Sequence, residues 1–342
     1  MKKVLLASTA LVLSAQYAAA EVEVSGDGRM GVVYEEQRAD DSEISFNSRL
    51  RIKFSASGET DGGLQFGGSV RADNAAPTSI ASTITDAEGR SPGDLGFDPN
   101  TVQVGNENSG GGANGLAGTV FVSGAYGKLT MGDIDSAAEN AIGDVSGVGY
   151  TGIGDLNETA YIAGGDDEGA LYEYTFDAFS VYASLGQPSA NMTSTGDSQE
   201  YALGFKYTMG NYSAALGYEN VSGDDNSLGD NFLISGTAAF GDATIKAVFS
   251  SSDLDSGIDT DQYAVSLDYV FGATTVTGFY RGVDQDAGID TDAFGIGASY
   301  DLGGGAALVG GIVNIDNDAD LVGDDDDSSS NTRADFGISM TF

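Results

Sequence analysis

Beyond residue 20, the chain alternates between apolar and small or polar side chains with a period of two. This is the period of a β-strand, in which successive side chains point to opposite faces. In residues 332–342, for example, Ala, Phe, Ile and Met occupy one face, and Arg, Asp, Gly, Ser and Thr occupy the other. Amphipathic helical periodicity is almost lacking, so the sequence predicts an all-β protein.

The turns between these strands recur at a fixed interval. Gly241, Gly272 and Gly303 follow Gly210 at successive steps of 31 residues. Each lies in a short Gly-containing connection that is typical of a tight hairpin turn. Acidic stretches rich in Ser and Gly connect the opposite strand ends. The repeating unit is therefore a β-hairpin with a tight turn at one end and a longer acidic loop at the other.

The same pattern predicts sixteen strands. They lie near residues 22–35, 43–57, 63–74, 116–124, 128–134, 169–176, 179–186, 199–208, 212–220, 231–240, 243–251, 262–271, 274–282, 292–301, 305–315 and 332–342. Strands of about ten residues cross a bilayer when they tilt by about 45°. Two connections, 75–115 and 135–168, are much longer than the others, and inserts of this kind usually carry function.

Aromatic residues flank the tight turns, among them Phe176, Tyr207, Tyr212, Phe240 and Phe271. This is the position of the aromatic girdle of a membrane barrel. A β-sandwich also alternates, but its oily faces pack together, and a secreted β-solenoid has a shorter, stricter repeat. A closed barrel leaves no sheet edge unpaired in lipid. The sequence thus predicts a 16-stranded antiparallel transmembrane β-barrel.

The composition excludes several functions. The chain has no His and no Cys, so it lacks the usual catalytic triads and the usual zinc, haem and iron–sulfur ligands. A formal charge of −38 argues against nucleic acid, whose binding needs clustered Lys and Arg. Disorder is excluded because 41% of the residues are hydrophobic and only 4 are Pro. We therefore expect a protein that is not an enzyme.

Residues 1–20 read as a signal peptide that is removed. Lys2 and Lys3 precede a short apolar stretch, and Ala18, Ala19 and Ala20 provide the small residues of a cleavage site. The apolar stretch is too short for a transmembrane anchor. Residues 21–342 are then expected to form a single barrel domain, and its lack of Cys means that no disulfide holds the fold.

Several segments carry a resemblance to a known family. They are VSGDGRMGV (24–32), GETDGGLQFG (58–67), GTVFVSGAYG (118–127), FGATTV (271–276), GASYDLGGG (297–305) and the terminal Phe342. Over essentially the whole chain beyond residue 20, the sequence resembles the alpha-proteobacterial, Rhodobacter-type general-diffusion porins. The resemblance implies the outer membrane of a Gram-negative bacterium, usually a homotrimer, and a third loop folded inward to narrow the pore. The unusually long segment 75–115 departs from the family pattern.

Five basic residues lie in the first three predicted strands: Arg29, Arg49, Arg51, Lys53 and Arg71. The alternation places all five on the faces that point away from lipid. Because adjacent strands lie about 4.8 Å apart, we expect these residues to form one basic patch on one wall of the lumen.

An acidic loop is expected to face this basic wall. Residues 135–168 contain no Lys or Arg. The candidate acidic residues of the constriction are Asp133, Asp135, Glu139, Asp144, Asp155 and Glu158. Folded across from the arginines, they would create a transverse field in a narrow aqueous pore. The alternative is that the arginines only pair with lumen acids such as Glu23, Asp27 and Asp73.

The expected function is passive diffusion of ions and small hydrophilic solutes, with a preference for cations because the lumen and mouth are acidic. A substrate-selective channel and a plugged structural or adhesive barrel are the alternatives. No cofactor is required. The resemblance implies calcium near the third loop, among the acidic residues of 135–168, with no ligand set defined. The expected partners are outer-membrane lipid and lipopolysaccharide, further copies of the chain, and no nucleic acid.

Overall fold

The computed structural model describes residues 21–37, 41–73, 118–153, 155–163, 168–186, 198–223, 229–255, 257, 259–286, 289–319 and 328–342. The expected signal peptide and the long segment 75–115 lie outside the described residues.

The described residues form strands and one short helix. The elements are β1 (Glu21–Gln37), β2 (Asp41–Glu59), β3 (Gln65–Asp73), β4 (Gly118–Gly124), β5 (Gly127–Asp133), α1 (Ala137–Ile142), β6 (Glu168–Phe176), β7 (Phe179–Gly186), β8 (Ser198–Met209), β9 (Tyr212–Gly223), β10 (Gly229–Phe240), β11 (Ala243–Leu254), β12 (Thr260–Phe271), β13 (Thr274–Gln285), β14 (Ile289–Gly303), β15 (Ala306–Ala319) and β16 (Ser328–Thr341).

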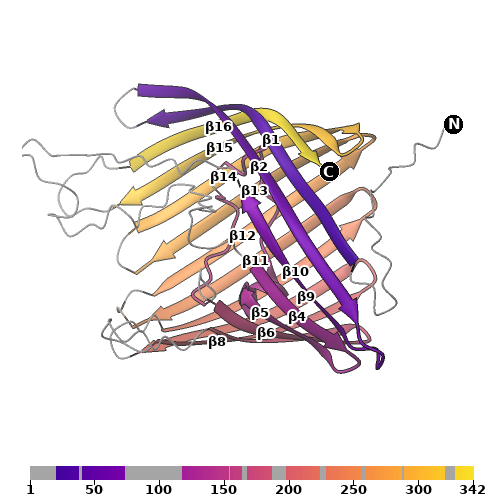
Figure 1. Ribbon diagram of the computed structural model, residues 1–342. Coiled ribbons are helices and arrows are strands. Elements are labelled where there is room, and N and C mark those ends of the chain that lie inside the picture. Colours follow the sequence, from indigo (N-terminus) through magenta and orange to yellow (C-terminus); the bar gives the residue numbers. More distant parts are fainter. Residues whose placement is uncertain are drawn as a thin grey trace, which may run out of the picture.

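The sixteen strands form one closed antiparallel barrel, as the sequence predicted (Figure 1). Every strand pairs with its neighbours in the sequence, and β1 pairs with β16 to close the sheet. The chain end takes part in the closure, since the Phe342 amide donates to the Gly26 carbonyl at 3.0 Å and the Gly26 amide donates to the Phe342 carbonyl at 2.7 Å. Closure leaves no sheet edge to be satisfied by lipid.

The barrel places its apolar face outside. On β12, Leu267 and Tyr269 are about half exposed on the outer face, whereas Gln262 and Ser266 are buried on the lumen side. The outward run from Tyr263 to Phe271 extends about 27 Å along the strand, or about 21 Å in height at a tilt of about 40°. This height suits the apolar band of about 25 Å that a membrane barrel presents to lipid.

Two rows of aromatic side chains border this band. Beside the tight turns, the ring centroids of Phe179 and Tyr207 lie 4.7 Å apart, which agrees with the expected girdle. A second row, which the sequence analysis did not identify, lies near the loop ends of the strands, where the Tyr263 and Tyr280 centroids are 6.0 Å apart. There the Tyr280 hydroxyl donates to Asp292 at 2.5 Å. A hydroxyl at the outer edge of the band is well placed for a membrane–water interface.

The turn glycines adopt the backbone conformation that their spacing predicted. Gly210, Gly241 and Gly272 have φ values of +59°, +61° and +64°, a region that side chains with a Cβ rarely adopt. No heavy atom lies within 4 Å of the position where their Cβ would be. Backbone conformation, not crowding, therefore requires glycine at these turns.

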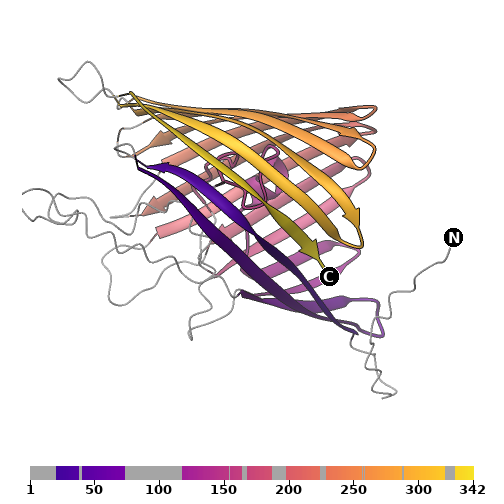
Figure 2. The same ribbon diagram turned by 90° about the horizontal axis from the view of Figure 1, so that it is seen from above.

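The segment that connects β5 to β6 lies inside the barrel (Figure 2). We call its described residues, 134–153 and 155–163, the inward loop. Its apolar residues pack against lumen-facing residues of the wall, so the main buried core lies in the lumen. Among the described residues, no helix is long and apolar enough to cross a membrane.

Candidate functional site

The first part of the inward loop is the helix α1, which lies on the lumen faces of β7 to β10. Ser136 begins it as the N-cap, since its hydroxyl accepts from the Glu139 amide at 3.0 Å, and Gly143 ends it with a φ of +58°. The wall beneath is made of small residues. A Cβ on Gly204 would lie 2.2 Å from the Ala137 carbonyl oxygen, and one on Gly217 would lie 3.0 Å from the Ala138 Cβ. Glycine at these two positions lets the helix lie directly on the strands.

The loop then follows the wall and returns. The Ser146 hydroxyl donates to Asp268 on β12 at 2.6 Å. At the far end, the Thr151 amide donates to Asp335 on β16 at 2.7 Å. On the way back, the Ala160 amide donates to Gln262 on β12 at 3.0 Å, and the Ile162 amide donates to Glu219 on β9 at 2.8 Å. The loop thus extends along the lumen from β7 to β16, as the prediction of an inward third loop required.

The basic wall consists of residues that are direct neighbours on β1, β2 and β3. Arg29 lies opposite Arg49 in the β1–β2 register, and Lys53 lies opposite Arg71 in the β2–β3 register. Arg49 pairs with Asp27 at 3.3 Å, so the expected pairing with a lumen acid is present as well. Like charges directly across a sheet repel, and one acid among these cations offsets part of that cost.

The tip of the loop approaches this wall. The Arg29 guanidinium donates to the Thr151 carbonyl at 3.3 Å and to the Tyr150 carbonyl at 3.5 Å. Asp155, just beyond the tip, is the loop acid on which Arg29, Arg49 and Arg51 all act electrostatically. Burial raises the pKa of Asp155, while the three arginines oppose that shift. The structure therefore brings together three of the five predicted cations and one of the predicted acids.

The other loop acids lie closer to the opposite wall. Burial, together with Asp135 and Asp144, raises the pKa of Glu139 to about 8. Burial and the charges of Asp155 and Asp144 raise the pKa of Glu158 to about 7. These carboxyl groups are therefore partly or largely protonated at neutral pH, so a count of acidic residues overstates the negative charge of the loop.

The remaining predicted residues lie at the margins. Asp133 ends β5 and Asp135 follows it, and both residues are exposed. Partial loss of hydration at the Asp135 carboxyl, together with the nearby charges of Asp133 and Asp144, raises the pKa of Asp135. Lys53 and Arg71 are exposed on β2 and β3. Asp133 and Asp135 lie where the loop leaves β5, and Lys53 and Arg71 lie opposite each other in the β2–β3 register. Their role in the constriction stays a prediction.

Several residues of the site were not singled out from the sequence. Lys246 on β11 and Arg281 on β13 lie near Asp144, and Arg281 also lies near Glu158. The barrel wall thus presents cations to the loop in two places, on β1 and β2 and on β11 and β13. Alternation alone would have placed both residues on the lumen face, but nothing in the sequence indicated that the loop passes over them.

Calcium was expected among the acidic residues of 135–168. Within the part of the chain that the structure describes, no group of three or more Asp or Glu side chains is arranged to hold a metal ion. Calcium in the loop stays a prediction.

Comparison with known proteins agrees with this architecture. A family model described as Gram-negative porin matches residues 7–320. A porin of Rhodobacter capsulatus is 35% identical and covers 94% of this chain and 100% of its own length. A solved porin structure with 35% identity and the same coverages has a TM-score of 0.70. An anion-selective porin from Comamonas acidovorans, 17% identical with the same coverages, has a TM-score of 0.69 and shares the fold.

The chain belongs to the Gram-negative porin family. Porins are channels, so the expectation that this protein is not an enzyme is confirmed. The family and the barrel point to the outer membrane as its location.

Proposed function

We propose that this porin lets ions and small hydrophilic solutes diffuse passively across the outer membrane and that it favours cations. The observation that carries the preference is the sign of the inward loop, which holds five acidic residues and no Lys or Arg among its described residues. The loop stays negative at neutral pH even though the pKa values of Glu139 and Glu158 are raised to about 8 and about 7. In a narrow aqueous pore the local potential sets the concentration of each ion, and only charges within about a Debye length of the path, about 8 Å at physiological ionic strength, contribute strongly.

The fold by itself does not determine the sign of the preference, since a porin described as anion-selective has the same fold. The sign of the preference must therefore depend on the charged residues at the constriction of each porin. Asp155 faces Arg29, Arg49 and Arg51 across the loop tip, so a permeating ion passes between opposite charges. The formal charge of −38 adds a negative potential around the pore, which supports the entry of cations at low salt.

Reversal potentials across a salt gradient in a planar bilayer test this proposal. The wild-type protein should show a cation/anion permeability ratio above one, and Asp155→Asn should lower it. Asp301→Asn, on the exposed tight-turn end of β14, is a matched control that should leave the ratio unchanged at physiological salt. A ratio below one for the wild type, or no conductance at all, would contradict the proposal. The second outcome would favour a plugged barrel.

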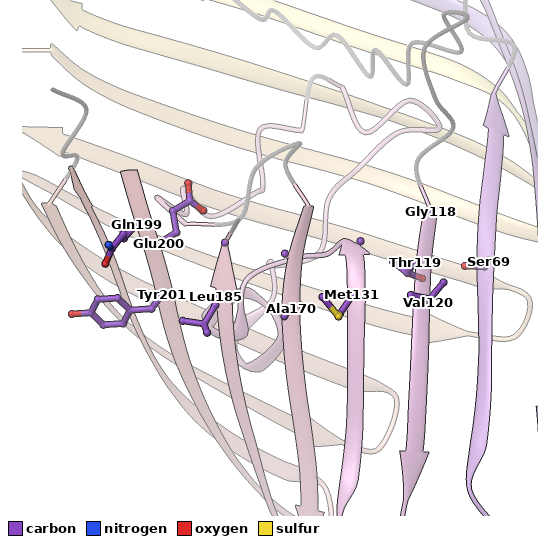
Figure 3. A pocket seen from close by; sticks show the side chains of 13 residues that line it. Ser69, Gly118, Thr119, Val120, Met131, Ala170, Leu185, Gln199, Glu200 and Tyr201 are labelled. Atoms are coloured by element: carbon purple, nitrogen blue, oxygen red, sulfur yellow. The ribbon is translucent and has the colours of Figure 1, made fainter. Parts of the chain in front are cut away.

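A homotrimer is part of the proposal. β5 has only seven residues, which give about 16 Å of height at a tilt of about 40°, less than the apolar band requires. Next to it, an outer depression of about 740 Å³ is lined by Val120, Met131, Ala170, Leu185 and Tyr201, among others (Figure 3). A second copy of the barrel would cover this low part of the wall. A clean monomer mass in mild detergent would reject the trimer.

Contact with lipopolysaccharide through divalent cations is also proposed. Exposed aspartates lie directly opposite each other in neighbouring strands near the loop ends: Asp230 and Asp253, Asp261 and Asp284, and Asp292 and Asp316. Asp230, Asp261 and Asp292 lie two residues before Phe232, Tyr263 and Phe294 and therefore share their outer face. The aspartates thus lie just beyond the second aromatic row. Paired like charges at this level favour cations that bridge to lipid phosphates.

A further inference from the structure

Apolar packing alone holds the helix α1 of the inward loop weakly. The helix α1 has only six residues, too few to be stable without tertiary contacts. The side chains between it and the wall are mainly Ala, which offer little interdigitation. The loop is also held by hydrogen bonds from its backbone and hydroxyl groups to polar side chains of the wall. Two acids of the wall, Glu219 and Asp335, accept five of these bonds.

The first of these wall acids holds the base of the loop. Glu219 on β9 is fully buried, with 0% of its surface exposed. It accepts from the Ser136 hydroxyl at 2.7 Å, from the backbone amide of Ile162 at 2.8 Å and from the side-chain amide of Asn231 at 3.0 Å. Ser136 precedes the helix and Ile162 lies in the returning segment, so one carboxylate joins both ends of the loop.

The second wall acid holds the tip. Asp335 on β16 is 6% exposed. It accepts from the Tyr150 amide at 3.1 Å, the Thr151 amide at 2.7 Å and the Thr151 hydroxyl at 2.6 Å. The carbonyl groups of the same two loop residues accept from Arg29. The peptide group between Tyr150 and Thr151 is thus bound at its amide by the Asp335 carboxylate and at its carbonyl by the Arg29 guanidinium.

Glycines shape the wall for this contact. A Cβ on Gly31 of β1 would lie 2.9 Å from the Tyr150 ring, and one on Gly337 of β16 would lie 3.0 Å from it. Gly149 has a φ of +82°, and a Cβ there would lie 2.4 Å from the Asp335 carboxylate. The tip therefore packs closely against Gly31 and Gly337, where the wall has no side chains, and against the Asp335 carboxylate.

We propose that Glu219 and Asp335 are positioning residues of the pore, which hold the inward loop at two distant points of the wall and thereby set the distance between Asp155 and the arginines. In this role neither acid has to contact a permeating ion. They act because buried amide and hydroxyl donors must find acceptors, and these two side chains provide acceptors only when the loop crosses the lumen. The pore width and its selectivity then depend on two residues that a permeating ion does not touch.

The test uses full-length Glu219→Ala and Asp335→Ala in planar bilayers. Each variant should show a higher mean single-channel conductance and a several-fold rise in open-channel current noise, because the loop fluctuates. Glu173→Gln is the matched control, since this acid of β6 pairs with Lys128 at 2.9 Å away from the loop, and it should behave as wild type. Heat-dependent gel migration verifies that each barrel is folded.

A disulfide rescue separates loop position from general stability. The chain has no Cys, so Ala138→Cys with Gly217→Cys introduces a unique pair at helix and wall. The Cβ positions lie 3.0 Å apart, and a shift of a few tenths of an ångström reaches the range of disulfides. In the Glu219→Ala background, oxidation should restore the low noise and reduction should remove it again. In the wild-type background the same bond should change little.

Two outcomes overturn the proposal. Folded Glu219→Ala and Asp335→Ala proteins with wild-type conductance and noise would show that apolar packing positions the loop. Noise that the disulfide does not reverse would show that Glu219 acts elsewhere. If the alanine variants do not fold, Thr151→Val, which removes one donor to Asp335, provides the same readout. The inference rests on the proposed channel function. A non-conducting wild type would refute that function. If the wild type conducts and the variants behave like it, only the positioning role is refuted.

Discussion

The cation preference should increase steeply between pH 6 and pH 9, because two acids of the inward loop titrate there. The pKa of Glu139 is raised to about 8 and that of Glu158 to about 7, in both cases mainly by burial. A raised carboxyl pKa means that the neutral form persists to higher pH. Glu139 is then about 1% ionised at pH 6 and about 90% at pH 9, and Glu158 about 10% and about 99%. The loop gains nearly two negative charges.

The size of the effect follows from Coulomb's law. A monovalent ion in water about 8 Å from one unit charge has an interaction energy of about 0.5 kcal/mol, reduced to about 0.2 kcal/mol by screening over one Debye length. Two charges give about 0.4 kcal/mol, which raises the cation concentration about twofold and lowers the anion concentration about twofold. The permeability ratio should therefore rise about fourfold at physiological salt and only about 1.3-fold near molar salt.

Reversal potentials measured at pH 6, 7, 8 and 9 provide the assay. Glu139→Gln with Glu158→Gln is the matched variant, and its ratio should be nearly independent of pH. Tyrosines of the loop do not contribute, since burial and Asp335 raise the pKa of Tyr150 to about 12. A flat wild-type profile would refute the raised pKa values, and an equally steep profile in the double variant would show that other groups titrate in this range.

Three further predictions concern the wall, the loop and the membrane. Arg49→Gln with Arg51→Gln should raise both the cation/anion permeability ratio and the conductance in planar bilayers; an unchanged ratio would place the constriction elsewhere. Gly204→Val should displace α1, because a Cβ there meets the Ala137 carbonyl at 2.2 Å, and should increase conductance while the barrel still folds. Gly278→Ala, whose Cβ would have no contact closer than 3.7 Å, should do neither. Chelation of divalent cations should lower the thermal unfolding midpoint of protein bound to lipopolysaccharide but not of protein in detergent alone, and equal shifts would argue against the cation bridge.

The barrel could be predicted from the sequence because its determinants are local. The alternation within each strand fixes which side chains face lipid, and the left-handed glycines at the tight turns fix where each hairpin reverses. The basic patch followed from the same alternation, since register then places Arg29 opposite Arg49. The inward direction of the loop came from family resemblance, and periodicity offers no independent sign of it.

The path of the loop could not be predicted, because it depends on contacts between distant segments. The sequence shows that the lumen faces of β8 and β9 carry small residues such as Ala and Gly. Only the structure shows that α1 packs directly on Gly204 and Gly217. Alternation places Glu219 and Asp335 on the lumen face but does not distinguish them from other lumen acids. Their importance follows from burial and from the loop donors that they bind, and neither property can be obtained from composition.

The arrangement of the cations explains why the number of acids does not by itself describe the constriction. Lys246 and Arg281 lie near Asp144 on one wall, so part of the negative charge of the loop is balanced where it contacts the strands. Burial neutralises Glu139 further at neutral pH. Asp155 differs, since Arg29, Arg49 and Arg51 of the basic wall all act on it electrostatically. Opposite charges therefore lie near each other where the tip of the loop meets the wall. The position of the loop, more than its composition, therefore determines what a permeating ion encounters.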